Sequence, residues 1–421
     1  MSGRAGGAGM FPARRRWLLA GLATGAAVVG GGAHGWRGVF NACLEALPPA
    51  IADHDLVRAA WAGVAPERFI DSHVHLIGTG DAGSGIEVNP RMTSPWHPLQ
   101  YAQRVFYMNA ACVDAASGRV DESYVERLRG LVDGLRPGAR VLLFAFDRFH
   151  DADGRADPRR STFYTPNAYA RAVAARYPRH FAWAASIHPY REDGVEALDA
   201  AVDAGALAVK WLPPAMGIDP GSPRCDRFYE ALARHGVPLI THAGEEKAVH
   251  GGDTQAFGNP LLLRRALDHG VRVVVAHCAS LGAAADLDRG ANAPPRACFE
   301  LFSRLMDDAR YENVLFADIS AVAQRNRDEA ILRVLLERGD WHRRLLNGSD
   351  YPLPGVLPLT SPADLAARDL LPASAVPLLE EIRQHNPLLF DFVLKRHLSW
   401  QGRRFAAGIF ETRAFFERKT A

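Results

Sequence analysis

The stretch Asp71-Ser72-His73-Val74-His75 decides the fold, because it closes an apolar run with two histidines. Residues 69–75 are typical of a β-strand, and in a strand side chains two residues apart point to the same side. The imidazoles of His73 and His75 can therefore reach one metal ion. This stretch predicts a strand whose carboxyl end presents metal-binding side chains.

Later apolar runs along the chain end in the same way, each with a side chain that can bind a metal. With their closing residues they are 206–210 (Lys210), 237–242 (His242), 271–277 (His277) and 344–350 (Asp350). A parallel barrel presents such residues one per strand end at its carboxyl-terminal face, where its chemistry takes place. The pattern therefore predicts one site assembled from several strand ends.

Helices are predicted between these strands. Segments 195–204, 226–235, 260–269 and 328–338 have helical periodicity, and each is followed by glycine, the residue that favours a left-handed helix end. Counting in this way gives eight predicted strands: 69–75, 140–147, 181–188, 206–211, 237–242, 271–277, 313–320 and 344–350. Alternating β and α units with right-handed crossovers predict an α/β fold, a (β/α)₈ TIM barrel. A doubly wound open sheet is the alternative, but it would not bring these strand ends around one centre.

The composition excludes some classes of protein. The 421 residues are 48% hydrophobic and 23% charged, with a formal net charge of +2, which is ordinary for a globular domain. No basic stripe interleaved with aromatic residues is present, so we predict no nucleic-acid partner. The five cysteines are scattered and never spaced Cys-x-x-Cys, which predicts small buried residues and no disulfide framework.

The N-terminus has the order of an export signal. Arg14-Arg15-Arg16-Trp17 precedes an apolar, glycine-broken stretch and resembles the twin-arginine motif. A cleaved signal and an uncleaved membrane anchor both remain open, and the lack of a clean small-x-small cleavage site favours the anchor. We therefore divide the chain into residues 1–35 (export signal or anchor), 36–68 (linker and lead-in) and 69–421 (barrel with a C-terminal helix). The protein is expected to be exported or membrane-anchored.

These motifs together resemble the amidohydrolase superfamily, in particular its amidohydrolase-related branch of TIM-barrel metal-dependent hydrolases. The resemblance covers about residues 69–396. Its carriers are Asp71-Ser72-His73-Val74-His75, Thr241-His242, Ala276-His277, Asn347-Gly348-Ser349-Asp350-Tyr351-Pro352 and Asn386-Pro387. It implies that the metal site consists of His73, His75, His242, His277 and Asp350. It also implies two roles for Lys210, which either becomes carboxylated and bridges two metals or pairs with a substrate carboxylate.

The chemistry requires these residue types. Neutral imidazoles and carboxylates are suitable ligands for a divalent metal ion. We expect zinc first, with either one or two ions. Such an ion lowers the pKa of a bound water molecule to about 7. Asp350 and His277 are the predicted catalytic residues, with Asp350 moving the proton. The leading function is hydrolysis of an amide, ester or lactone bond in a small molecule. The alternatives are decarboxylation or hydration of a carboxylic acid with one metal, and a non-catalytic barrel that binds a metal or ligand.

Substrate contacts are predicted from the loops and strand ends. The long loop from residue 77 to about 113 is a candidate lid or binding loop. The predicted substrate-binding residues are Asn89, Arg91, Trp96, His188, Trp211 and His250. Glu245 and Glu246 either support the metal ligands from behind or form a solvated acidic pair, and we favour the solvated pair.

Overall fold

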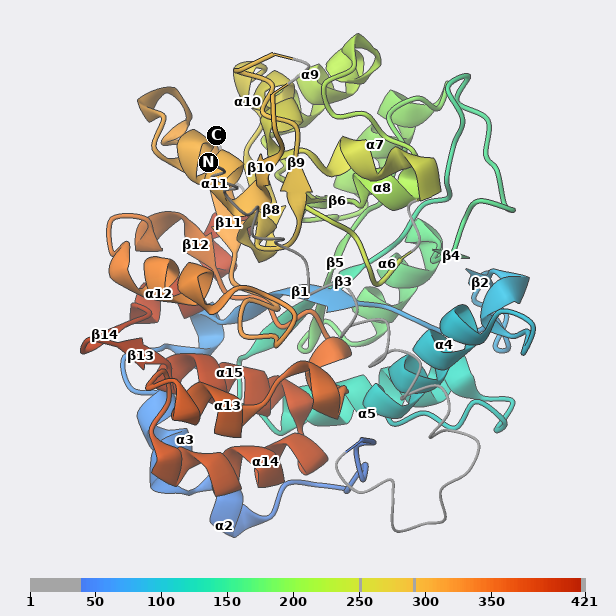
Figure 1. The fold of residues 1–421 in the computed structure, drawn as a ribbon. Coiled ribbons are helices and arrows are strands. Elements are labelled where there is room, and N and C mark those ends of the chain that lie inside the picture. The colour runs from blue at the N-terminus through green and yellow to red at the C-terminus, as the bar shows by residue number, and fades with distance from the viewer. Residues whose placement is uncertain (1–38, 250–251, 291–292, 418–421) are drawn as a thin grey trace, which may run out of the picture.

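The computed structural model describes residues 39–249, 252–290 and 293–417, and a set of eight parallel strands lies at its centre (Figure 1). Each of the eight predicted strands is present, and each is shorter than predicted. The strands are β1 (Ile70–His75), β3 (Arg140–Phe144), β5 (Phe181–Ala184), β6 (Val209–Trp211), β7 (Leu239–His242), β8 (Val273–Ala276), β11 (Leu315–Asp318) and β12 (Leu345–Leu346).

The eight strands form a closed ring. Hydrogen bonding orders them as β1-β3-β5 and as β12-β11-β8-β7-β6, with neighbours parallel. Two parallel bridges join these sheets, Ala185 with Val209 at one seam and Val74 with Tyr351 at the other. The ring confirms the predicted barrel and excludes the doubly wound sheet, which would have two open edges.

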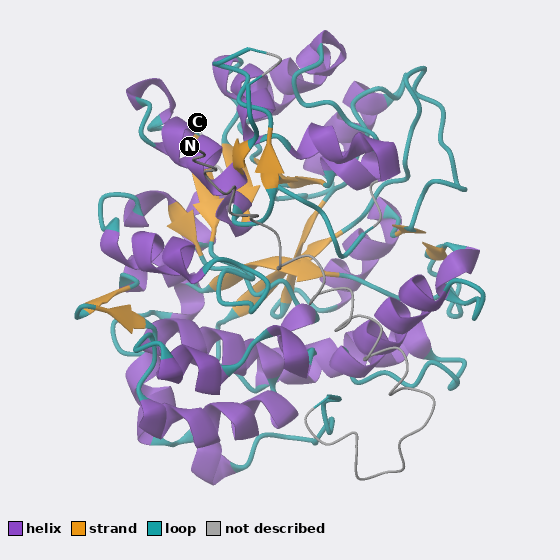
Figure 2. Cartoon of the chain, in the orientation of Figure 1, coloured by secondary structure: helices purple, strands orange, loops and turns teal. Residues whose placement is uncertain are grey.

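Helices surround the strands, as the secondary-structure colouring shows (Figure 2). The helices that return the chain from one barrel strand to the next are α5 (Val120–Asp133), α6 (Asn167–Arg176), α7 (Gly194–Asp203), α9 (Asp226–His235), α10 (Arg264–Asp268), α11 (Cys298–Met306) and α12 (Glu329–Glu337). After the last strand come α13 (Pro362–Ala367), α14 (Val376–His385), α15 (Pro387–His397) and α16 (Arg413–Phe416). Helix α9 ends as predicted, with Gly236 in the left-handed conformation at φ +62°.

Short elements complete the fold. Helices α2 (Pro49–Ala52) and α3 (Asp55–Ala60) precede the barrel, α4 (Pro98–Ala110) occupies much of the long loop after β1, and α8 (Pro213–Met216) follows β6. The remaining strands pair as antiparallel hairpins or bridges: β2 (Glu87–Val88) with β4 (Phe163–Tyr164), β9 (Ala283–Ala284) with β10 (Arg296–Ala297), and β13 (Ser399–Trp400) with β14 (Arg403–Arg404).

The barrel interior is apolar at one end and polar at the other. Phe415 and Phe416 of α16 join the buried apolar side chains inside the barrel, and the ring of Phe415 packs on that of Phe316 with centroids 4.7 Å apart. Further along, residues two apart on a strand share the interior, so Ile240 is followed by His242. Apolar packing therefore occupies the amino-terminal part of the barrel, and the predicted metal-binding side chains lie at the carboxyl end.

One prediction concerns the start of the chain. Residues 1–35, predicted to be a signal or anchor, lie outside the described residues. Within the part of the chain that the structure describes, no helix is both long and apolar enough to cross a membrane.

The prediction that the cysteines are ordinary small buried residues and not a disulfide framework is wrong for two of the five. Cys43 and Cys112 are bonded, and 69 positions separate them in sequence. The bond joins the segment before the barrel to the end of α4, a pairing that no local spacing could reveal. Cys225, Cys278 and Cys298 are free and buried, as predicted.

Candidate metal centre

The carboxylate of Asp350 lies among three imidazoles. Its Oδ1 is 3.1 Å from Nε2 of His75 and 3.4 Å from Nε2 of His73, and its Oδ2 is 3.9 Å from Nε2 of His277. The four residues come from three strand ends, β1, β8 and β12. The ligand atoms of His73, His75 and Asp350 all lie within 4.8 Å of one another, which is close enough to share one ion.

His277, directly after β8, and Asp350, four residues after β12, adopt an unusual backbone. His277 has φ +55° and Asp350 has φ +63°, in the left-handed region that residues other than glycine rarely occupy. Such conformations persist where the surrounding structure fixes them, and they occur often at functional sites. These two conformations turn the side chains of His277 and Asp350 into the mouth of the barrel, beyond the paired residues of β8 and β12.

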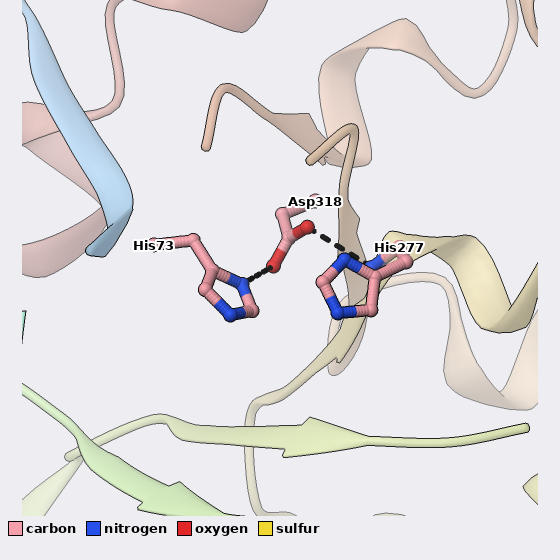
Figure 3. Close-up of side chains that lie close together, drawn as sticks. All are labelled: His73, His277 and Asp318. Carbon is pink, nitrogen blue, oxygen red and sulfur yellow. Dashed lines mark hydrogen bonds and ion pairs between the residues drawn. The ribbon is translucent and has the colours of Figure 1, made fainter. Parts of the chain in front are cut away.

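Asp318, at the end of β11, organises two of the histidines (Figure 3), and sequence reasoning missed it. Its Oδ2 accepts a hydrogen bond from Nδ1 of His73 at 2.9 Å, and its Oδ1 accepts one from the backbone N–H of His277 at 3.0 Å. The signal was available, because the predicted strand 313–320 contains an aspartate where other strands carry histidine. A carboxylate behind an imidazole fixes its tautomer and orientation, which leaves Nε2 of His73 facing Asp350.

His242 supplies the observation that tests whether a metal fits. Both of its ring nitrogens are buried and, among the described residues, neither makes a hydrogen bond, although Nδ1 lies 3.4 Å from Oε2 of Glu246. The ring lies beside that of His277, with centroids 5.6 Å apart. A buried nitrogen without a hydrogen bond costs free energy, and a divalent ion would engage Nε2, for which no polar contact is found among the described residues. The donor set of imidazoles and carboxylates therefore fits such an ion.

The charges of the cluster agree with this fit. Burial lowers the pKa of His73 to about 4, with the charge of Lys210 adding to the effect, and burial lowers the pKa of His242 and His277 as well. Burial alone would raise the pKa of Asp350, but the neighbouring His277 and His73 outweigh it and lower that pKa. Neutral imidazoles and an ionised carboxylate are the forms that bind a divalent cation.

Lys210 lies where it was predicted, at the end of β6 inside the barrel. It is 1% exposed, and its Nζ is 3.3 Å from Nε2 of His73. Burial lowers the pKa of this ammonium to about 8, while the charges of Asp318 and Asp350 oppose the shift. Lys210 therefore places a positive charge or a nucleophilic amine against the cluster.

The prediction of a solvated pair at residues 245 and 246 is half wrong. Glu245 is exposed and pairs with Lys247 at 3.3 Å. Glu246 is buried, and its Oε1 accepts the backbone N–H groups of Ala248 and Val249 at 2.6 and 2.8 Å. Its other oxygen, Oε2, is 3.4 Å from Nδ1 of His242. Glu246 thus belongs to the surroundings of the cluster.

Two further groups near the cluster were not predicted. Arg327, on the loop after β11, donates to Oγ of Ser280 at 2.7 Å, and the carboxylates of Asp350 and Glu246 partly offset the lowering of its pKa by burial. Tyr107, on α4, donates to the carbonyl oxygen of Ala248 at 3.0 Å. Neither residue lies at the end of a predicted strand, so the strand-end pattern could not identify them.

Two predicted substrate contacts lie in the core instead. The side chain of Trp211 is fully buried, its indole N–H donates to the carbonyl oxygen of Ile187 at 2.8 Å, and its ring packs against Phe228 and Tyr229. The prediction for Trp211 is wrong because, next to Lys210 on the strand, it points to the opposite face.

His188 is also buried. Its Nε2 bonds to the carbonyl oxygen of Met216 at 3.0 Å, and its Nδ1 accepts the backbone N–H of Tyr190 at 3.2 Å. With both ring nitrogens engaged, His188 has a structural role and not the predicted substrate contact.

The other predicted contacts lie at the protein surface. Asn89 and Arg91 line a cavity of about 300 Å³, which Arg159, Arg160 and Asp253 also border. Trp96 is 88% exposed. His250 lies outside the described residues. The structure brings none of the described three into the metal cluster, and their contact with a substrate stays a prediction.

A family model described as amidohydrolase matches residues 70–387, which is most of the barrel. The chain therefore belongs to the amidohydrolase family, in its amidohydrolase-related TIM-barrel branch. No curated protein matches the chain.

Solved structures with similar folds share little sequence with it. An uncharacterised TIM-barrel protein from Bordetella bronchiseptica is 16% identical, with 83% of this chain and 98% of that chain covered and a TM-score of 0.47. 5-Carboxyvanillate decarboxylase from Sphingomonas paucimobilis is 13% identical, with 82% and 98% covered and a TM-score of 0.43. A protein from Acinetobacter baumannii described as a probable 2-pyrone-4,6-dicarboxylic acid hydrolase is 14% identical, with 68% and 84% covered and a TM-score of 0.40. These are similarities only, and we draw nothing about the reaction from them.

Proposed function

We propose that this protein is a metal-dependent hydrolase that cleaves an amide, ester or lactone bond of a small molecule. The observation that carries the proposal is the approach of the Asp350 carboxylate to Nε2 of His73, His75 and His277 at 3.1–3.9 Å. Zinc is the ion we propose first, because imidazole and carboxylate donors suit it. When bound, the ion would polarise the carbonyl under attack and lower the pKa of water.

The protein's own residues would orient the reactants and move the proton. Asp350, ionised and buried at the barrel mouth, would accept the proton of the attacking water at a carboxylate oxygen and pass it to the leaving group. His277 would help to hold the ion through Nε2, which lies 3.9 Å from Oδ2 of Asp350, because its Nδ1 is bonded to Oγ of Ser320 at 2.7 Å. Arg327 and Tyr107 are candidates for contact with the substrate beside the cluster.

A second function is favoured by the cations beside the cluster. Nζ of Lys210 lies 3.3 Å from Nε2 of His73, and the carboxylates of Asp350 and Glu246 raise the pKa of buried Arg327 against the effect of burial. Two cations can hold a substrate carboxylate next to a single ion, which suits decarboxylation or hydration of a carboxylic acid. This candidate uses the same site and differs in the substrate that it turns over.

The test combines metal content with an activity screen. The purified protein would be analysed by elemental mass spectrometry, stripped with a chelator, and reconstituted with zinc or manganese. Each form would be assayed on esters, lactones, amides and aromatic carboxylic acids. Turnover of the first three groups that depends on metal supports the hydrolase, and carbon dioxide release from the acids supports the decarboxylase. Tight metal binding without any turnover would instead favour the non-catalytic barrel.

We also propose that the protein works outside the cytoplasm, exported or anchored through its first 35 residues. The bond between Cys43 and Cys112 supports this, because disulfides persist mainly in oxidising compartments. Fractionation of cells that express the full chain tests it. Recovery of the protein in the cytoplasm alone, with both thiols free, would contradict the proposal.

A further inference from the structure

Three buried charged side chains lie behind the candidate metal centre. They are Asp71 on β1 and the pair Asp391 and Lys395 on α15, with 3%, 8% and 1% of their surface exposed. None of these three residues belongs to the groups of His and Asp side chains that could hold a metal ion. Burying charged groups is costly unless they are paired and hydrogen-bonded, so their contacts show what they hold.

Asp71 connects the first and last strands of the barrel. Its Oδ1 accepts the backbone N–H of His73 at 3.2 Å and the backbone N–H of Ser349 at 2.8 Å. One of these residues is a candidate ligand, and the other immediately precedes the candidate ligand Asp350. A single carboxylate oxygen therefore fixes the backbone on both sides of the seam that brings the imidazole and the carboxylate together.

Lys395 holds the same turn from the other direction. Its Nζ donates to the carbonyl oxygen of Gly348 and to Oδ2 of Asp391, both at 2.6 Å. Gly348 lies directly against β1, because a Cβ atom on it would meet the Cβ of His73 at 2.7 Å. Asp391 precedes Lys395 by one helical turn and anchors its ammonium, so α15 reaches the turn that carries Asp350.

The turn needs this support because of its conformation. Asp350 has φ +63°, and its backbone N–H donates to the carbonyl oxygen of His73 at 2.8 Å. A non-glycine residue stays in this conformation only where neighbouring contacts fix it. Asp71 contacts Ser349, and Lys395 contacts Gly348. These are the two residues just before Asp350, so the contacts constrain the backbone that sets the direction of the Asp350 side chain.

We propose that Asp71 and Lys395, the latter oriented by Asp391, are positioning residues that set metal affinity by fixing the backbone of His73 and Asp350. The inference rests on the proposed function only in that the cluster binds a divalent ion. Residues that hold ligands in place commonly change metal affinity by roughly 10–100-fold when they are removed. A merely structural role would lower stability without changing affinity.

The first experiment compares two variants of one helix. Lys395→Met removes the bond to Gly348 and keeps an unbranched side chain. Arg396→Met is the matched control, because Arg396 is the next residue and donates to the carbonyl oxygens of Ala60 and Ala62 at 2.7 and 2.8 Å, in the segment before the barrel. Zinc affinity is measured by calorimetry on the metal-free full chain, and Tm is measured in parallel. We expect Lys395→Met to weaken zinc binding by roughly 10–100-fold and Arg396→Met to leave it within about twofold, with Tm lowered in both.

A second pair of variants decides the question if Lys395→Met does not fold. Asp71→Asn keeps an oxygen that can accept both N–H groups, whereas Asp71→Ala removes it. We expect zinc affinity to be close to wild type in Asp71→Asn and to fall in Asp71→Ala. Equal affinities in all folded variants would overturn the proposal. A wild-type protein that binds no divalent ion would instead overturn the proposed function, so the two failures are distinguishable.

Discussion

Oδ2 of Asp318 lies 2.9 Å from Nδ1 of His73, and this contact commits the histidine to one tautomer. Nδ1 carries the proton and Nε2 is left with its lone pair toward Asp350. The same carboxylate accepts the backbone N–H of His277, so one residue of β11 orients side chains from β1 and β8.

Asp318→Asn should therefore weaken metal binding. An amide has one oxygen, and its NH₂ group would face either the Nδ1–H of His73 or the N–H of His277. We expect zinc affinity to fall by roughly 10–100-fold, as measured by calorimetry. Asp340→Asn, at an exposed ion pair with Arg338, is the control and should bind as wild type. Unchanged affinity in Asp318→Asn would mean that the contact does not orient His73.

Asp350→Asn should keep the fold and lose turnover. The amide is nearly isosteric with the carboxylate and leaves the imidazoles in place, but it cannot accept the proton. We expect kcat to fall by roughly 10²–10⁴-fold on the best substrate of the screen, with little change in the circular dichroism spectrum. A variant with nearly wild-type kcat would sink the proposed role of Asp350.

Lys210→Ala reports the number of metal ions. If the ammonium pairs with a substrate group, the metal content should stay at one ion per chain. KM should rise by about 10–100-fold because the bond between the ammonium and the substrate is lost, and a hydrogen bond to a charged group usually contributes this much to binding. Elemental analysis and steady-state kinetics measure the two quantities. A fall from two ions to one would show instead that Lys210 bridges a pair of metals.

The metal-free protein should become less stable on acidification. Burial holds the pKa of His73 at about 4 and lowers the pKa of His242 and His277, whereas in the unfolded chain all three would titrate near 6.5. Below pH 6.5 the unfolded chain binds more protons, so the free energy of unfolding falls as pH falls toward 4. Each histidine contributes at most about 1.4 kcal/mol per pH unit.

Urea unfolding with a chelator between pH 7.5 and 5 measures this dependence. His242→Asn should make it shallower, because one of the three groups no longer takes up a proton. Stability that rises toward pH 5, or a slope that is unchanged in the variant, would contradict the assignment of a neutral His242.

Cys43→Ser should lower stability through the loss of the disulfide. Closing a chain loop across 69 positions restricts the unfolded state, and such bonds contribute roughly 2–4 kcal/mol. Thermal unfolding with and without a reductant should show the reductant lowering Tm of the wild type and leaving Cys43→Ser unchanged. The buried Cys225→Ser variant should keep the response to the reductant.

Strand ends could be predicted from the sequence because each combines an apolar run with one polar residue. From the sequence alone, that pattern predicts the positions of His73, His75, His242, His277 and Asp350 at the strand ends. Contacts made by side chains from loops and helices could not be predicted in this way. The approach of Glu246 to His242 depends on the course of the loop after β7, and the bond of Lys395 to Gly348 depends on how α15 packs on the turn before Asp350; neither follows from the local sequence.

The direction of a side chain within its strand was the other feature that the prediction missed. Trp211 follows Lys210 directly, and the alternation of a strand sends neighbours to opposite faces. The rule that united His73 with His75 therefore excludes Trp211 from the site. The strands were also predicted too long, because His277 and Asp350 have left the ladder and turned into the mouth with positive φ.

The seam between β1 and β12 has a consequence for biosynthesis. His75 and Asp350 are 275 residues apart along the chain, so at about 5–20 residues per second their synthesis is separated by roughly 14–55 s. For that whole interval a nascent chain contains His73 and His75 but not Asp350. It cannot complete the centre before β12, the last strand of the barrel, has been synthesised. Metal loading is thus a late step. An export route that carries only folded proteins would move the loaded centre, whereas one that threads unfolded chains would leave loading to the far side of the membrane.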